Sequence, residues 1–237
     1  MRLDARTVRA LTLTAWGALF LWLWVTGESV RYLGPRTQWV VPLGAIGLGL
    51  AAAGYVRATR EGPSPRVGTP ELLGLIGLVL PILAAATLAD AQLGSLAASN
   101  KLSARGVDPS ALARLASKDA SEIGFLQLNA AGRDARLAGE LGLADGKPVH
   151  LVGFVTGTPR GPRRRFELSR FYITCCVADA VPIGVQVEAG PTRGRLRKDD
   201  WLDVTGPLVR DRDAWVVRAA RLRHVGAPSH PYLSFTS

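Results

Sequence analysis

Three apolar runs without a charged side chain dominate the first 90 residues of the chain and limit what it can fold into. With their flanking residues, each is long enough to cross the roughly 30 Å hydrocarbon core of a bilayer. The pattern therefore predicts a multi-pass protein of the cell membrane. Its transmembrane region, residues 1–89, is expected to hold three helices, at about 10–26, 39–56 and 72–89.

The first run follows Arg2, Arg6 and Arg9, so a cleaved signal peptide competes with a retained span. No small-x-small cleavage site closes the run, and two further apolar runs follow it. These two observations favour a retained helix.

Arginine placement gives the expected orientation, because positive residues concentrate in cytoplasmic loops. Six arginines lie in the N-terminal tail and the second connection, and two lie in the first connection: Arg2, Arg6, Arg9, Arg57, Arg60 and Arg66, against Arg31 and Arg36. We therefore expect a cytoplasmic N-terminus and an extracytoplasmic C-terminal half.

The three runs carry no Asp, Glu, Lys, Arg or His, which weighs against a conduction pathway built by this chain alone. Anchor helices are the simpler interpretation. Such helices lie in the lipid bilayer and can also pack against a larger membrane partner.

The C-terminal half is basic. From residue 147 onward it has 15 Lys and Arg against 8 Asp and Glu, which is +7 of the net charge of +10. A basic surface can serve nucleic acid or anionic lipid, but Arg-rich usage is also typical of a GC-rich genome. Few aromatics lie among the basic clusters, so a nucleic-acid partner is not expected. No phosphate loop, G-x-S-x-G or H-E-x-x-H motif is present, and we do not expect an enzyme.

Residues 90–146 read as a helical connector. Asp108 and Pro109 are the cap and first residue of an expected helix that continues to Lys118. A second helix is expected from Ser121 to about Gly139.

From Pro148 the pattern changes to short β-rich runs separated by Gly, Pro and charged residues. Five such runs in residues 147–226 predict a small OB-like five-stranded barrel, with a five-stranded sandwich as the alternative. The fold class is thus a membrane α-helical N-terminal half plus an all-β C-terminal domain, followed by a tail at 227–237. The runs are 149–156, 165–177, 183–187, 201–205 and 215–222.

Both cysteines lie in the stretch from Arg170 to Ala180 (RFYITCCVADA). Adjacent cysteines make a poor structural disulfide, because Cα atoms about 3.8 Å apart fall short of the usual separation. If the strand continues through this stretch, alternation places Cys175 and Cys176 on opposite faces. Cys175 is then expected in the core and Cys176 is expected to be accessible.

A zinc site is one hypothesis for this stretch, with Cys176, Asp179 and Cys175 as ligands. The histidines His150, His224 and His230 could add to it, although their spacing matches no ligand motif. The alternative is packed cysteines beside a turn-forming Asp179. Arg170 is expected to pair with Asp179 or Glu167.

Several motifs together resemble the YcgQ-type family of bacterial membrane proteins. They include a structural motif of Arg170, Trp201 and Gly206, and the resemblance extends over nearly the whole chain. The quoted segments are Phe166–Ala180, Val185-x-Val187, Asp200-Trp201-x-x-Val204-x-Gly206, Pro231-Tyr232-Leu233, Leu93-Gly94-Ser95 and Gly153-Phe154-Val155.

The resemblance implies a subunit that accompanies a multi-spanning YcgR-type permease, with a link to zinc homeostasis in some relatives. Many relatives carry a His-rich loop between the second and third spans, whereas residues 57–70 contain no histidine here. Cys176 and Asp179 match the family positions, and position 175 is His in some relatives.

Two functions are therefore expected as alternatives. One is a membrane-anchored accessory subunit of a two-component permease involved in divalent metal, specifically zinc, homeostasis. The other is a membrane-tethered OB-like module that binds another ligand and has no transport role.

Overall fold

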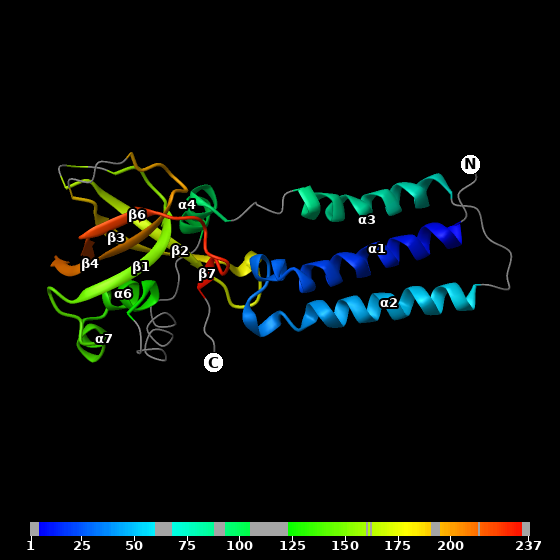
Figure 1. Cartoon of the computed structure of the whole chain (residues 1–237), viewed down its shortest axis with the longest axis horizontal. Coiled ribbons are helices and arrows are strands. Elements are labelled where there is room, and N and C mark those ends of the chain that lie inside the picture. The colour runs from blue at the N-terminus through cyan, green and yellow to red at the C-terminus, as the bar shows by residue number, and fades with distance from the viewer. Residues whose placement is uncertain are drawn as a thin grey trace. The chain divides into compact units, whose positions relative to one another are not determined.

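The fold is that of a computed structural model, which describes residues 5–59, 68–87, 93–104, 123–159, 161, 163–190, 195–212 and 214–233. The chain divides into two compact units, Met1–Ala91 and Gln92–Ser237 (Figure 1). The predicted helix from Asp108 to Lys118 lies outside the described residues.

The first unit is helical, and its two leading helices lie side by side. Small residues allow their close approach, since a methyl group added to Gly17 would lie 3.5 Å from Leu48 Cβ. Phe20 covers Gly44 in the same way. The elements are α1 (Ala5–Val25), η1 (Glu28–Arg31), η2 (Pro35–Thr37), α2 (Val40–Ala58) and α3 (Thr69–Thr87).

Two stretches of this unit, Ala5–Val25 and Pro35–Ala58, are long and apolar enough to cross a membrane. The third predicted span falls on α3, whose apolar stretch Leu73–Ala84 is shorter and contains Pro81. Its last two predicted residues, 88 and 89, lie outside the described part. The number of spans and their orientation stay predictions.

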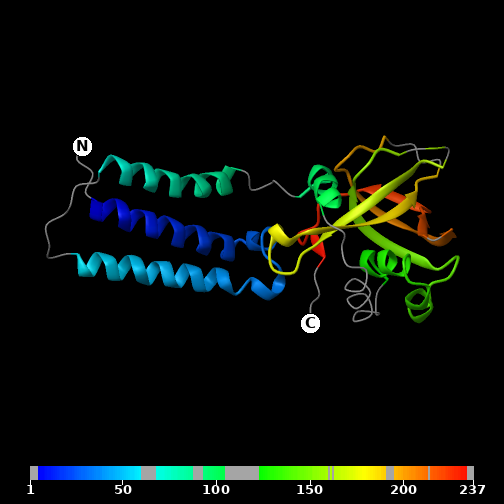
Figure 2. The ribbon, with the colours of Figure 1, turned by 180° about the vertical axis from the view of Figure 1, so that it is seen from behind.

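Three α-helices of the second unit are described: α4 (Ser95–Ala104), α6 (Phe125–Ala131) and α7 (Ala135–Glu140). The prediction of a single helix from Ser121 to about Gly139 is wrong, because the helical conformation ends after α6. Asp134 starts a new helix there, since its Oδ1 accepts the amides of Arg136 at 2.9 Å and Leu137 at 3.2 Å. In Figure 1 and in the reverse view of Figure 2, α4 lies on one side of the sheet and α6 and α7 on the other.

Five strands of this unit form a closed hydrogen-bonded ring in the order β1-β2-β3-β5-β4 and back to β1. The five predicted strands are confirmed as members of this ring, although the fifth predicted run divides into two strands. The strands are β1 (Pro148–Val155), β2 (Arg165–Tyr172), β3 (Val181–Glu188), β4 (Trp201–Asp211), β5 (Ala214–Arg218), β6 (Arg221–His224) and β7 (Tyr232–Leu233).

The segment expected to be a C-terminal tail contributes β7, which pairs in parallel with the end of β2. Within the ring, every pairing is antiparallel except that between β3 and β5. That parallel seam joins only Gln186–Glu188 to Val216–Arg218, whereas β2 and β3 pair along the whole of both strands.

Alternation along the strands builds the core. Buried side chains such as Leu168, Val187, Leu202 and Val217 face inward and pack with the apolar face of α6. A smaller cluster gathers under α4, where Ala98 meets the stacked rings of Phe154 and Phe171, 5.5 Å apart. The two clusters attach α4 and α6 to the ring.

Candidate functional site

The cysteine stretch leaves the sheet before it reaches the cysteines. β2 ends at Tyr172, and the Ile173 amide still donates to the carbonyl of Leu233 at 3.1 Å. A bend then leads into the short helix η3 (Val177–Asp179). The expectation that the strand continues to Val177 is therefore wrong.

Asp179 organises this bend. Its carboxylate accepts the backbone amides of Thr174 at 3.0 Å, Cys175 at 2.7 Å and Cys176 at 3.5 Å. The Asp179 carboxylate oxygens thus accept hydrogen bonds from amides that would otherwise pair with a neighbouring strand. The turn-forming interpretation of Asp179 is confirmed.

The same contacts set the protonation of the two side chains. Partial burial would raise the pKa of Asp179, but hydrogen bonds from the Cys175 thiol and from the three amides outweigh it, so the pKa is lowered. Hydrogen bonding to the Asp179 carboxylate, followed by that to Cys176, raises the pKa of Cys175 to about 11. Cys175 is therefore a protonated thiol at neutral pH.

The two thiols do not lie on opposite faces of a strand. Cys175 is exposed and Cys176 is half-buried, which reverses the expected assignment. The two Sγ atoms are 3.8 Å apart. The physical reason is the bend, since period-two alternation holds only while the backbone stays extended.

These residues do not fit a closed zinc site. The Asp179 oxygens are engaged by backbone amides, and the three side chains fall short of the four ligands of a structural zinc site. Within the described residues, no group of three or more His, Cys, Asp or Glu side chains could hold a metal ion.

The histidines have other neighbours. His150 Nε2 lies 2.8 Å from Asp203, His224 Nδ1 lies 3.8 Å from Asp200, and His230 contacts Ser229. The structure thus brings Cys175, Cys176 and Asp179 together and adds no histidine to them.

The three motif residues have structural positions. Arg170 donates to the backbone carbonyls of His230 and Pro231, not to Asp179 or Glu167, and burial lowers its pKa. Trp201 opens β4 and its ring lies 5.7 Å from that of Phe154. Gly206 lies where the chain after β5 crosses β4, and a side chain there would meet the amide of Ala220 at 2.9 Å.

An ion cluster around the buried Glu188, at the end of the β3–β5 seam, was not predicted from the sequence. Glu188 is buried and contacts Arg165, Arg163 and Arg218, and Arg165 also binds Asp211. Burial would raise the pKa of Glu188, but the contacts with Arg165, then Arg218 and Arg163, lower it. The available signals were an acidic residue at the end of one apolar strand and three consecutive arginines at the start of the strand before it.

At the other end of the seam, α6 contacts β3. Asn129 Nδ2 donates to the carbonyl of Gly184 at 2.9 Å, where β3 diverges from β5. A groove of about 460 Å³ runs beside this contact, and Trp215 forms part of its wall. The Trp215 Nε1 is buried and has no hydrogen-bond partner in the described part of the chain.

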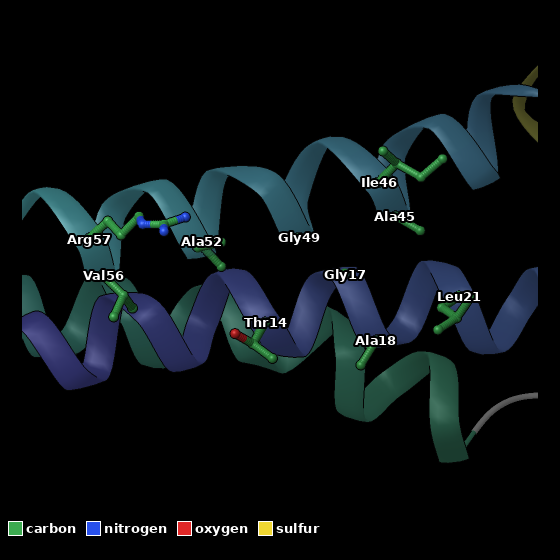
Figure 3. A pocket seen from close by; sticks show the side chains of 11 residues that line it. Thr14, Gly17, Ala18, Leu21, Ala45, Ile46, Gly49, Ala52, Val56 and Arg57 are labelled. Atoms are coloured by element: carbon green, nitrogen blue, oxygen red, sulfur yellow. The ribbon is translucent and has the colours of Figure 1, made fainter.

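A larger groove of about 800 Å³ lies between α1 and α2 in the first unit (Figure 3). Its walls are made mostly of small side chains, and Arg57 lies at one end. The small residues include Thr14, Gly17, Ala18, Ala45, Gly49 and Ala52. Large apolar side chains such as Leu11, Leu43 and Leu50 are exposed on the same two helices.

The match to a known protein family lies in the second unit. Residues 140–234, which include the ring, match the model of a family described as the DUF1980 C-terminal domain. No curated protein matches the chain. Among solved structures, the chain is similar to a small single-stranded DNA-binding protein from Streptomyces coelicolor, with 20% identity and a TM-score of 0.28 over 36% of this chain and 97% of that one.

Proposed function

We propose that this chain is a membrane-anchored accessory subunit of a multi-spanning permease, and that the α1–α2 groove receives one transmembrane helix of that partner. The groove is the observation that carries the proposal. Helices associate in lipid mainly by close packing, and small residues let two backbones approach. The YcgR-type permease implied by the sequence resemblance is the partner we propose.

The exposed apolar surface of α1 and α2 supports a membrane location for this groove. We take the five-strand ring to be an OB-like barrel carried by this anchor, on the support of its closed strand order. We place it outside the cell, following the arginine distribution. Zinc remains the cargo class implied by the resemblance, and we assign no resident zinc ion to this chain.

The test is co-purification of the full chain with a YcgR-type permease after co-expression, using two matched glycine variants of α2. Gly49 lines the groove and Gly47 does not, and an added Cβ meets nothing within 4 Å at either position. Gly49→Leu therefore places a large side chain in the groove, and its Cβ has room there. We expect it to reduce the retained permease several-fold.

Gly47→Leu should retain the permease at the level of the unsubstituted chain. If both variants retain it equally, the groove is not the docking surface. If the unsubstituted chain retains no permease, the accessory role itself is wrong.

The groove beside α6 favours a second candidate, a membrane-tethered binding module with no transport role. Its volume lies within the range of small-molecule sites, and a buried Trp215 N–H could donate to a ligand that reached it. A full chain that purifies without a permease but protects Trp215 from fluorescence quenching when a ligand is added would favour this function.

A further inference from the structure

The two thiols lie together on a bend whose backbone is fixed from within. Asp179 holds the amides of residues 174, 175 and 176, so the positions of both Cα atoms are set by one carboxylate. Neither cysteine lies in a strand, although Cys176 forms a single β-bridge pair. A change of side-chain rotamer leaves the backbone hydrogen bonds of both residues in place.

We propose that Cys175 and Cys176 form a reversible oxidation site, in which a small-molecule disulfide converts the two thiols into a disulfide between neighbouring residues. The proposal stands on the 3.8 Å separation of the sulfurs, the exposure of Cys175 and the bend that holds both residues. It does not depend on the permease partnership.

The reaction proceeds in two exchange steps. The exposed Cys175 thiol first loses its proton to solvent, and the thiolate attacks one sulfur of the oxidant RSSR, which gives a mixed disulfide and releases one thiolate RS⁻; because Cys175 is mostly protonated at neutral pH, this first step is slow. Cys176 then loses its proton and attacks the Cys175 sulfur, which it already contacts, and displaces the second RS⁻. The two cysteines lose two electrons and two protons, and the oxidant is reduced to two thiols.

The bend makes such a disulfide labile. Neighbouring Cα atoms about 3.8 Å apart are closer than an unstrained bridge requires, and closing the ring pulls on amides that Asp179 holds. Strained and exposed disulfides are the readily reduced ones. Neighbouring cysteines make a poor structural disulfide. The same strain suits a site that is oxidised and reduced repeatedly.

The test uses the full chain in detergent with oxidised glutathione as the probe, read by intact mass. The unsubstituted chain should lose two hydrogens and carry no glutathione, and dithiothreitol should restore the starting mass. Cys175→Ser and Cys176→Ser leave one thiol each. The Cys176→Ser chain should accumulate a glutathione adduct, because the thiol that resolves it is missing.

Several results overturn the proposal. An unsubstituted chain that keeps glutathione adducts, stays unmodified, or links two copies through a disulfide has no such site. The decisive result comes from the unsubstituted chain, so a folding defect in either serine variant does not affect it. Far-UV circular dichroism before and after oxidation should show that the helices and sheet persist.

Discussion

The Asp199 carboxylate caps the first turn of α4 across 104 residues of sequence: it accepts hydrogen bonds from the Ser95 amide and, at 2.9 Å, from the Ser95 hydroxyl. Asp199 itself has φ of +69°, a left-handed conformation that Asp and Asn tolerate better than other non-glycine residues. A side chain at Gly94 would meet the same carboxylate. This contact attaches α4 to the loop before β4.

Replacing Asp199 should loosen α4. Asp199→Ala removes the cap and leaves a methyl-bearing residue in the left-handed region, which we expect to cost about 2 kcal/mol. Hydrogen exchange of residues 93–104 in the full chain should quicken accordingly. Asp199→Asn keeps an acceptor oxygen and tolerates the conformation, so it should lose less. Equal loss in the two variants would show that the cap is unimportant.

Glu188→Gln should destabilise the second unit by about 2 kcal/mol, because it removes the ionic partner of Arg165, whose side chain is itself partly buried. Chemical denaturation followed by tryptophan fluorescence measures the loss. Glu140→Gln is the matched control. Glu140 also forms an ion pair with an arginine, Arg136, but both side chains are largely exposed. The expected change in unfolding free energy is therefore below about 0.5 kcal/mol. Similar losses of stability in the two variants would show that the burial of Glu188 does not matter.

The Glu188 cluster also predicts acid sensitivity. The folded-state pKa of Glu188 lies below the ordinary value of 4.5, so its contribution to stability is present above that value and declines as pH falls toward the folded-state pKa. Midpoints of denaturation measured from pH 6 downward should fall more steeply in the unsubstituted chain than in Glu188→Gln. Parallel pH profiles would refute this assignment.

Gly206→Ala should destabilise the ring by about 2 kcal/mol, since the new methyl group has no room beside Arg218 and Ala220. Gly157→Ala tests whether any added methyl group has this effect. An added Cβ there meets nothing within 4 Å, so it should leave the thermal midpoint nearly unchanged. A tolerated Gly206→Ala would mean that the crossing relaxes easily.

Cys175 should alkylate slowly at pH 8, because its pKa is raised to about 11, chiefly by the Asp179 carboxylate. Only the thiolate reacts, so the rate should rise continuously as pH increases toward that value. In Asp179→Asn the pKa falls toward the ordinary one, and iodoacetamide labelling of Cys175 at pH 8 should become several-fold faster. An unchanged rate in Asp179→Asn would exclude the carboxylate as the cause.

Local patterns predicted the sheet because apolar alternation is a property of each strand by itself. The Val149–Thr156 run, for example, predicted β1 almost to the residue. The same rule failed at Cys175, since a carboxylate four residues later competed for the amides and ended the strand. A warning was present in the sequence, because Asp179 before Val181-Pro182 was recognised as a turn former.

Other features depend on contacts between distant residues, which no local pattern reveals. Ser95 and Asp199 are 104 residues apart in sequence, and β7 is too short to be predicted without its partner β2. The three residues of the candidate site, Cys175, Cys176 and Asp179, come from one stretch of sequence and lie together in the structure. The geometry of the site depended on a bend, so the predicted accessibility of the two cysteines was reversed.

The β3–β5 seam has a mechanical consequence. Its three residue pairs are bracketed by Asn129 at one end and by the Glu188–Arg218 contact at the other. Thermal motion can open the ring along this seam, and the contacts at its two ends should set how often it does so. The seam and the β1–β2 pairing, which has two residue pairs, are the shortest pairings in the ring, and the groove lined by Trp215 lies beside the seam.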